Sequence, residues 1–365
     1  MTSVTEPKKI ILVKPAHVYY THADLESAHA FLLDFGFAEE KRVGSKIYYR
    51  GYGPDPFVYC ASQGDKTEFG GVAFVVESED DLKLASQTIP GASEIYTLED
   101  APGGGKCVTF KDPVDGFPFH LVWGQKERAG KREVDEKDEL PNGNPLHLTF
   151  NFPEDKQRPA GKFQRFKKAP APVYKLGHVG VCVTDFPKTF EFYTSRFNFY
   201  PSDLLHKPDS KEYFNTFCRL DRGSELVDHH CFFFFEGPKY HVHHSSFETH
   251  DFDTQVLGHD WLRHKGYENC WGVGRHIMGS QIFDYWFDPS KFILEHYVDG
   301  DLLDNTYPTQ KKAASHDGIH DLTFQQDSWT ERNFGLEVNI VDVIGNFRLK
   351  IINQKKKTIF RNSVN

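Results

Sequence analysis

The sequence predicts an α+β fold in which a small unit of strands and helices occurs twice in tandem. Two observations lead to this prediction. The order strand, helix, several strands, helix, strands runs twice along the chain at matched positions. The 365 residues exceed one typical domain, and the hydrophobic share of 39%, with 15% aromatic residues, can fill ordinary cores.

Each copy opens with a strand that runs into an amphipathic helix. The segments 14–37 and 175–199 both place a histidine, His17 or His178, in the strand and an Asp near the helix start. Apolar residues then recur with helical spacing. They are Ala28, Phe31 and Leu32 in the first copy and Phe186, Phe190 and Tyr193 in the second.

Two later segments of each copy also match. Residues 71–85 parallel 244–258, where a strand runs into a helix, and residues 106–124 parallel 283–300, where an Asp-Pro turn joins two strands. The intervening stretch is rich in Pro, Lys and Arg and has no apolar period, which is typical of a linker. We therefore divide the chain into a tail (1–14), an N-terminal module (15–126), a linker (127–172), a C-terminal module (173–305) and an extension of unknown structure (306–365).

Composition restricts the partners and the compartment. The net charge of −9 and the pI near 6.1 argue against nucleic acid or an anionic membrane as the main partner. No run of 18 apolar residues and no secretory signal is present. The six cysteines lack CxxC spacing, which favours reduced thiols in the cytoplasm. We also expect a homo-oligomer.

The stretch HVHHSSFETHD, residues 241–251, raises the question of a metal site. Because side chains alternate along a strand, His243 and His244 are expected on opposite faces, so a sheet must collect metal ligands from different strands. The matched strand positions of the second copy are His178, His244 and Glu295. Two imidazoles and one carboxylate leave coordination sites open and are typical of non-haem Fe(II), although Mn(II) suits the same ligands.

The first copy offers a poorer set at the same positions, His17, Gly71 and His120. Glycine supplies no ligand atom. We expect the metal in the C-terminal copy alone, with His17 and His120 in structural roles.

The motifs that contain these ligands resemble a known family. LGHVG (176–180), HSSFE (244–248) and ILEHY (293–297) resemble the metal-binding strands of type I extradiol ring-cleavage dioxygenases, the catechol and 2,3-dihydroxybiphenyl dioxygenases of the vicinal oxygen chelate superfamily. The resemblance is specific over residues 176–300. It implies two tandem modules, each of paired βαβββ repeats that form a cupped sheet, with the metal in the C-terminal module.

Further motifs extend the resemblance beyond the metal. DHHC (228–231) is similar to the family's paired-histidine strand, and GRH (274–276) is followed by Tyr285 at the family's spacing. The resemblance implies that His230 is the acid/base of ring cleavage, that His276 orients a substrate hydroxyl and that Tyr285 hydrogen-bonds a catecholic oxygen. We expect His229 to pack on the opposite face from His230.

The resemblance implies an enzyme of aromatic catabolism. It would insert O₂ into a catechol-type or polyhydroxylated aromatic substrate, beside the diol, at a mononuclear Fe(II) centre. Phe186, Phe190, Tyr213, Phe214 and Phe217 suggest a roomy apolar pocket for that substrate.

Three positions depart from the family pattern. Asp284 stands where an apolar residue is usual, Lys291 where Gly or Pro is usual, and Gly279 where Asp is frequent. None of them is a metal ligand.

Two alternatives stay open. A metal-dependent isomerase or lyase of the glyoxalase type uses the same fold. It does not need the set His230, His276 and Tyr285, and it usually takes metal ligands from both tandem copies. A non-catalytic protein that binds a small molecule is the other alternative, and the intact ligand set argues against it.

Overall fold

The computed structural model describes residues 8–128, 140–143, 153–154, 161, 163, 165–314 and 322–323. Most of the predicted linker (127–172) and most of the predicted extension (306–365) lie outside these residues. The domain boundaries therefore stay predictions.

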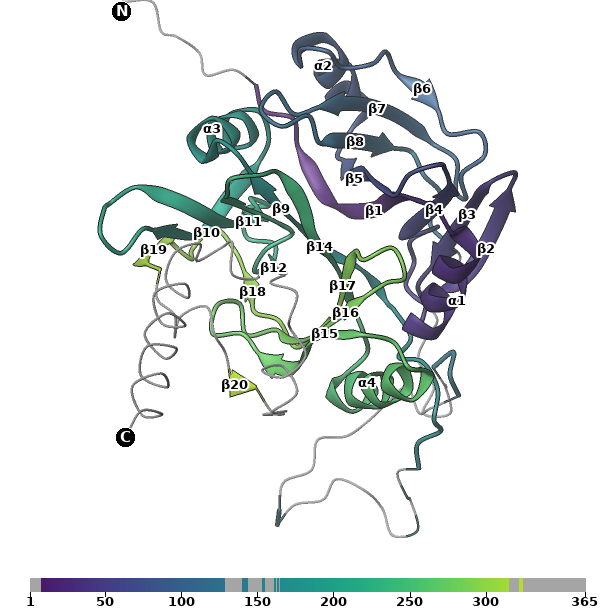
Figure 1. Cartoon of the computed structure of the whole chain (residues 1–365). Helices are drawn as coiled ribbons and strands as arrows, with labels where there is room; N and C mark the ends of the chain where they lie inside the picture. Colours follow the sequence, from purple (N-terminus) through teal and green to yellow (C-terminus); the bar gives the residue numbers. More distant parts are fainter. Residues whose placement is uncertain are drawn as a thin grey trace, which may run out of the picture.

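The N-terminal module is an eight-stranded sheet with two helices (Figure 1). Its strand order is β2-β3-β4-β1-β5-β8-β7-β6. The strands are β1 (Leu12–His22), β2 (Ala38–Val43), β3 (Lys46–Arg50), β4 (Tyr59–Gln63), β5 (Glu68–Val76), β6 (Tyr96–Thr97), β7 (Lys106–Lys111) and β8 (Pro118–Trp123), and the helices are α1 (Leu25–Phe35) and α2 (Glu79–Thr88).

The C-terminal module is a ten-stranded sheet with the order β19-β10-β11-β13-β9-β14-β17-β16-β15-β20, beside the short pair β12-β18. Its strands are β9 (Lys175–Val183), β10 (Phe199–His206), β11 (Tyr213–Leu220), β12 (Val227–Asp228), β13 (Phe232–Glu236), β14 (His241–Glu248), β15 (Asn269–Arg275), β16 (Ile282–Phe287), β17 (Ile293–Val298), β18 (Leu302–Leu303), β19 (Gln310–Ala313) and β20 (Leu322–Thr323). Its helices are α3 (Phe186–Arg196) and α4 (Phe252–Lys265).

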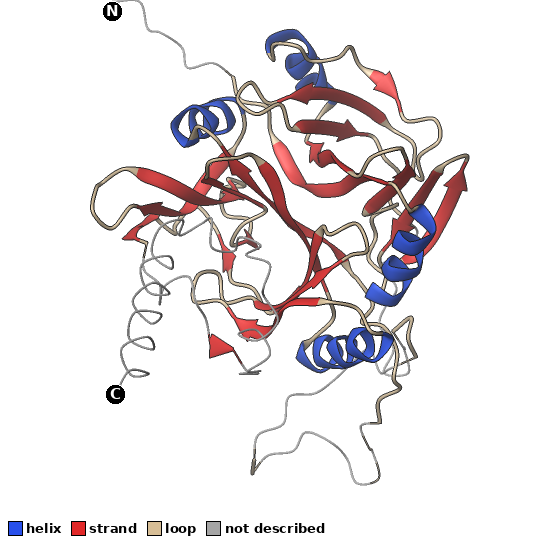
Figure 2. Cartoon of the chain, viewed as in Figure 1, coloured by secondary structure: helices blue, strands red, loops and turns tan. Residues whose placement is uncertain are grey.

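The predicted duplication is confirmed, because the chain forms two similar modules, and each module is itself built from two repeats. Each sheet contains a βαβββ repeat followed by a second one, and the two repeats meet where β1 pairs antiparallel with β5, or β9 with β14. The few helices lie outside the curled sheets (Figure 2). The α+β class is therefore confirmed.

The helices begin where their capping residues stand. Asp24 and Asp185, the two Asp residues expected near helix starts, each accept a backbone N–H from three residues further on. Helix α1 ends at Gly36, whose φ of +112° lies in the left-handed region. A Cβ on Gly36 would collide with the carbonyl group of Ala171, so both the conformation and the close approach require glycine.

The two modules share one hydrophobic core. Predicted core residues such as Phe31 and Tyr193 belong to a single buried cluster that contains side chains of both sheets. Polar contacts join the modules as well: the Tyr20 hydroxyl lies 2.7 Å from Ser245 Oγ, and His296 Nε2 lies 2.7 Å from the carbonyl oxygen of Phe35. The N-terminal module thus covers the back of the sheet that contains the candidate metal ligands.

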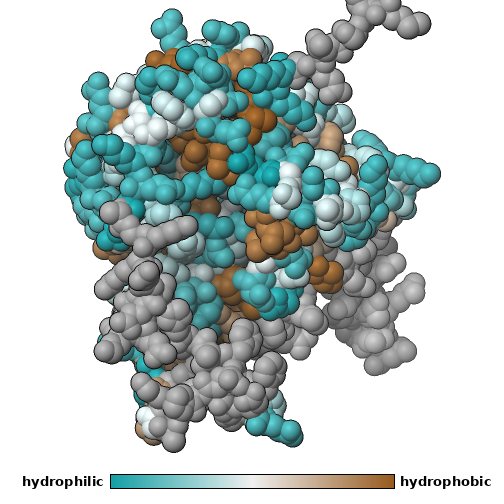
Figure 3. Space-filling model, turned by 180° about the vertical axis from the view of Figure 1, so that it is seen from behind, coloured by the Kyte–Doolittle hydropathy of each residue, from teal (hydrophilic) through white to brown (hydrophobic). Residues whose placement is uncertain are grey.

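The surface is correspondingly polar. Seen from behind, hydrophilic side chains cover most of the described surface, with separate small apolar patches (Figure 3). Within the described ranges, no helix has the length and apolar character that a bilayer crossing needs. All six cysteines are buried free thiols.

The turn between β16 and β17 contains a buried carboxyl group at the module interface. Asp288 Oδ1 accepts the backbone N–H of Phe292 (2.8 Å), whereas Oδ2 is buried without a hydrogen-bond partner. Burial raises the pKa of Asp288 to about 7 and lowers the pKa of nearby His22 to about 4, so the 3.9 Å contact between them is not an ion pair at neutral pH. In the same turn Lys291 has a φ of +69°, which explains why glycine is usual there.

Replacing Asp288 by Asn is expected to stabilise the protein in a pH-dependent way. A carboxyl group whose pKa rises on folding holds its proton more tightly in the folded state, so its contribution to the free energy of unfolding falls as the pH rises from about 4 to about 7. The advantage of the Asp288→Asn variant should grow over this range to at most about 4 kcal/mol. Urea unfolding of both proteins at several pH values measures it, and His22 contributes equally to both. An advantage that stays constant between about pH 5 and pH 8 would contradict the raised pKa.

Candidate metal centre

The sheet register brings the predicted site residues onto one face. Ser246 of β14 pairs with His178 of β9 on one side and with Glu295 of β17 on the other, and Glu295 pairs with Tyr285 of β16. Directly opposed residues of neighbouring strands share a face. His244 lies two residues before Ser246 and therefore joins the same face.

The three predicted ligand atoms converge closely. His178 Nε2 lies 3.0 Å from Glu295 Oε2 and 3.1 Å from His244 Nε2, and His244 Nε2 lies 3.1 Å from Glu295 Oε2. Two ligands held about 2.1 Å from one ion at a right angle are about 3.0 Å apart, whereas a tetrahedral angle separates them by about 3.4 Å. The observed triangle fits one face of an octahedron, the arrangement that leaves positions open.

Electrostatics also suit a cation. All three side chains are buried, and neither carboxylate oxygen of Glu295 has a hydrogen bond of good geometry. Burial works to raise the pKa of Glu295, but His178 and His244 hold it well below its usual range. Burial lowers the pKa of His244. An ionised carboxylate beside neutral imidazole is the ligand state that a divalent metal requires, so these residues fit a metal.

The expectation that His243 faces away from His244 is wrong. The β9–β14 register shifts between Val242 and His244, so a bulge at His243 interrupts the alternation. The Nδ1 atoms of His243 and His244 lie 2.7 Å apart, and the His243 ring packs between Phe233 and Phe235. His243 therefore contacts the non-ligating nitrogen of a metal ligand.

His230 lies over the ligand set as expected. Its ring centroid is 4.2 Å from that of His178 and 5.1 Å from that of Phe217. Burial, reinforced by His178 and His229, lowers the pKa of His230 well below its usual value, so at neutral pH this imidazole can accept a proton.

The expectation that His229 packs on the opposite face from His230 is wrong. Residues 229–231 form a bend between β12 and β13, so strand alternation does not apply there. The Nδ1 atoms of His229 and His230 lie 3.1 Å apart, and His229 Nε2 lies 2.8 Å from Asp203 Oδ2.

His276 and Tyr285 complete the arrangement. His276 Nε2 lies 3.0 Å from the Tyr285 hydroxyl and 3.9 Å from Glu295 Oε1. The Tyr285 ring meets His244 edge-on at 5.0 Å. The structure thus brings all six predicted site residues together on one side of the sheet.

Two departures from the family pattern have structural reasons. Asp284 is fully buried but accepts hydrogen bonds from His259 Nδ1, Asn269 Nδ2 and Trp286 Nε1. Gly279 has a φ of +83°, and a Cβ there would lie 2.8 Å from His229 Nδ1. In this chain His229 therefore occupies space beside the position where the family often has Asp.

The corresponding site of the first module is filled by a tyrosine. The register row His17–Ala73–His120 matches His178–Ser246–Glu295, and it places Gly71 at the position of His244, as expected. The Tyr19 hydroxyl lies 2.9 Å from His17 Nε2, and its ring packs against His120. His120 is further held by Thr109 Oγ1 at Nδ1 and by the carbonyl oxygen of Gly70 at Nε2. The structural role expected for both histidines fits these contacts.

The predicted aromatic pocket is largely wrong. Phe186 and Phe190 pack against Phe234 beneath α3, in the core rather than at the site. Of the five aromatic residues proposed, Phe217 is the one that contacts His230.

Sequence reasoning missed Tyr19, His243 and Asp203. A detailed alignment of the repeats would have revealed Tyr19, because it stands where the second copy has Gly180. No local motif distinguishes Asp203.

The bulge at His243 changes what substitution there should do. We expect His244→Ala to lose most of the bound metal, because a ligand is removed. His243→Ala should lower metal affinity about 10- to 100-fold, the usual cost of losing a partner of a ligating histidine. His241→Ala, on the same strand with its ring held at Lys239, is the matched control and should bind normally. Titration of the metal-free proteins with Fe(II) or Mn(II) measures all three, and unchanged affinity in His243→Ala would show that His243 only packs.

The tyrosine-filled first module predicts one metal per chain. The double change His17→Ala and His120→Ala should leave this stoichiometry unaltered, with only a modest loss of stability. Elemental analysis of both proteins tests it. Two metals per chain in the unaltered protein, falling to one in the variant, would mean that the first module also binds metal.

Comparison with known proteins gives a family for the second module. Residues 175–295 match the model of the Glyoxalase/Bleomycin resistance protein/Dioxygenase superfamily. Metapyrocatechase 2 of Cupriavidus necator is 26% identical over 129 residues, which are 35% of this chain and 38% of the relative. The match thus spans about two fifths of that relative's length.

Solved structures match over both modules. The Mn(II)-bound glyoxalase from Novosphingobium aromaticivorans has a TM-score of 0.67 at 20% identity, covering 84% of this chain and 89% of the glyoxalase. Homoprotocatechuate 2,3-dioxygenase from Arthrobacter globiformis has a TM-score of 0.67 at 17% identity, covering 88% of this chain and 91% of the dioxygenase. These likenesses confirm the two-module fold. The segment 175–295 is therefore similar to the glyoxalase/dioxygenase superfamily, in a chain whose fold is like that of an extradiol dioxygenase.

Proposed function

We propose that the protein is an extradiol dioxygenase that cleaves the ring of a catechol-type or polyhydroxylated aromatic substrate with O₂. One observation carries the proposal. Three side chains with the chemistry to handle protons and substrate hydroxyls, His230, His276 and Tyr285, converge on the same face as the ligand set. A metal site alone would not need them.

His178, His244 and Glu295 would hold a divalent metal, with Fe(II) proposed and Mn(II) compatible with the same ligands. Such a metal would bind the diol and O₂ and would let electron density pass between a singlet substrate and a triplet oxidant. Because Glu295 would be the one anionic ligand of this set, the centre would keep a net positive charge, which favours a deprotonated diol.

His230 would accept and return protons at Nε2. Its Nδ1 is engaged by His229, so Nε2 is the ring nitrogen available to the substrate. Because burial keeps the imidazole neutral, it can first take a proton from a substrate hydroxyl and then act as the acid when the O–O bond breaks.

His276 and Tyr285 would orient the diol. The Tyr285 hydroxyl lies 3.0 Å from His276 Nε2, which itself lies 3.9 Å from Glu295 Oε1, so both groups would be within reach of a substrate oxygen at the site. The ring of Phe217 contacts His230 and that of Phe233 contacts His244, and these apolar rings would help to exclude water from the reacting ring.

A glyoxalase-type isomerase is the second candidate, because a Mn(II)-bound glyoxalase matches the fold equally well. Two features favour the dioxygenase. All three ligands come from the C-terminal module, and in the corresponding site of the first module the Tyr19 hydroxyl contacts His17 Nε2.

The deciding experiment is oxygen consumption by anaerobically Fe(II)-loaded protein with a panel of catechols. Stoichiometric O₂ uptake with a yellow ring-cleavage product supports the proposal. Isomerisation of a hemithioacetal without O₂ uptake supports the glyoxalase, and tight catechol binding with neither reaction supports a binding protein.

A cytoplasmic location belongs to the proposal, since six free thiols suit a reducing compartment, and so does the expected homo-oligomer.

Replacing His230 by Phe separates chemistry from binding. The variant should keep its metal and its affinity for catechol but turn over about 10²- to 10⁴-fold more slowly, because an acid/base group is lost while the ring volume is retained. Metal analysis, catechol titration under anaerobic conditions and steady-state O₂ uptake measure the three quantities. Loss of metal in this variant would make His230 a ligand and would contradict the assigned triad.

A further inference from the structure

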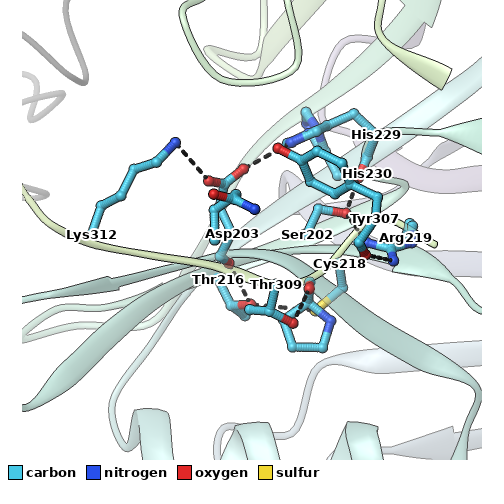
Figure 4. A network of polar contacts seen from close by, with 12 residues as sticks. Ser202, Asp203, Thr216, Cys218, Arg219, His229, His230, Tyr307, Thr309 and Lys312 are labelled. Atoms are coloured by element: carbon cyan, nitrogen blue, oxygen red, sulfur yellow. Dashed lines mark hydrogen bonds and ion pairs between the residues drawn. The ribbon is translucent and has the colours of Figure 1, made fainter. Parts of the chain in front are cut away.

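A buried chain of hydrogen bonds leads away from His230. His230 Nδ1 lies 3.1 Å from His229 Nδ1, and His229 Nε2 lies 2.8 Å from Asp203 Oδ2. The side chains of His229 and Asp203 are 3% and 2% exposed, so water does not compete for these bonds. The second oxygen of Asp203 lies 3.3 Å from Lys312 Nζ, on the other side of the carboxylate (Figure 4).

The backbone around His229 is held from two directions. Ser202 Oγ donates to the carbonyl oxygen of His229 (2.6 Å), and the backbone N–H of His229 donates to the carbonyl oxygen of Asp301 (2.9 Å). Ser202 Oγ in turn accepts a hydrogen bond from Arg219 (3.0 Å). The His229 ring therefore has little freedom to leave Asp203.

These contacts determine which nitrogens carry protons. Burial works to raise the pKa of Asp203, but His229 and Lys312 hold it below its usual value, so the carboxylate only accepts hydrogen bonds. His229 must then donate from Nε2, and in the neutral ring its Nδ1 is a lone pair. That lone pair accepts the N–H of His230 Nδ1, which leaves His230 Nε2 unprotonated toward the site.

Gln281 is the other polar neighbour of His230 Nδ1. Its Nε2 lies 3.5 Å away, at the limit of a hydrogen bond, and its amide orientation follows from the network rather than setting it. A Cβ on Gly279 would lie 2.6 Å from Gln281 Oε1 and 2.8 Å from His229 Nδ1, so the glycine leaves room for both side chains.

We propose that Asp203 and His229 are positioning residues that fix His230 in the tautomer with Nδ1 protonated, so that Nε2 faces the substrate as a proton acceptor. The role assigned to His230 rests on the proposed function, whereas the tautomer itself does not. The arrangement follows the logic of a carboxylate that orients a catalytic histidine, with a second imidazole inserted between the two.

Asp203→Asn is the informative variant. The Lys312 ammonium favours the amide oxygen on its own side, so the amide nitrogen turns toward His229 and donates to Nε2. His229 then carries its proton on Nδ1 and donates to His230, which is forced into the tautomer with Nε2 protonated. We expect kcat to fall about 10²- to 10⁴-fold with KM and metal content nearly unchanged.

The tautomer is read directly by nitrogen NMR of metal-free protein labelled in its histidines, in which protonated and unprotonated ring nitrogens have well-separated shifts. Loss of signals in His229→Gln and His230→Gln assigns the two rings. Asp203→Glu, which keeps the carboxylate, should restore the original tautomer at least in part. Lys312→Gln and Gln281→Met are matched controls that keep the Asp203–His229 bond and should keep the tautomer.

The outcomes separate the two proposals. An exchange of the protonated nitrogen of His230 in Asp203→Asn, absent from both controls, supports the positioning role even if no catechol is cleaved, in which case the proposed function alone fails. An unchanged tautomer in Asp203→Asn, or a kcat within about threefold of the unaltered enzyme, would overturn it. The same exchange in Gln281→Met would assign the control of His230 to Gln281 and would equally overturn it.

Discussion

The structure depends on one buried negative charge that needs a cation. Glu295 sits at the centre of a ten-stranded sheet with neither carboxylate oxygen properly hydrogen-bonded, and two imidazoles stand about it at metal-ligand spacing. An uncompensated buried carboxylate would cost several kcal/mol. A divalent metal at this point would offset that cost, and the surrounding sheet, the shared core and the N-terminal module hold the three side chains at metal-ligand spacing.

Duplication explains both the presence of this site and its absence from the other module. Both sheets place the same register row across corresponding strands, so the first module has the geometry for a metal but not the side chains. There the Tyr19 hydroxyl contacts His17 and the Tyr19 ring packs against His120, whereas in the second module Gly180 leaves the corresponding space to the ring of Phe233. Tyr19 in place of a glycine, together with Gly71 and His120 in place of His244 and Glu295, thus distinguishes the filled module from the one that can bind a metal.

The sequence was sufficient for everything that follows from regular periodicity. The repeats, the capping Asp24 and Asp185, and the meeting of His178, His244 and Glu295 all follow from strand alternation and matched register. Irregular backbone defeated the same reasoning. The bulge at His243 and the bend at His229 turned both side chains toward the site, and each had been expected to point away from it. Asp203 lies 26 residues from His229 in the chain, a pairing that only the three-dimensional fold reveals.

The short strand β19 has a consequence for where this protein can be divided. It runs parallel to β10 beyond the end of the superfamily match, and Lys312 reaches back from it to Asp203. Arg219 binds the carbonyl oxygens of Asp304 and Tyr307 in the same segment. A fragment ending at Gly300 would contain all six candidate site residues, yet it would lack β19 and Lys312 and would leave one edge of β10 unpaired. The contacts that support the site therefore extend beyond residues 175–295, the segment that the superfamily model matches.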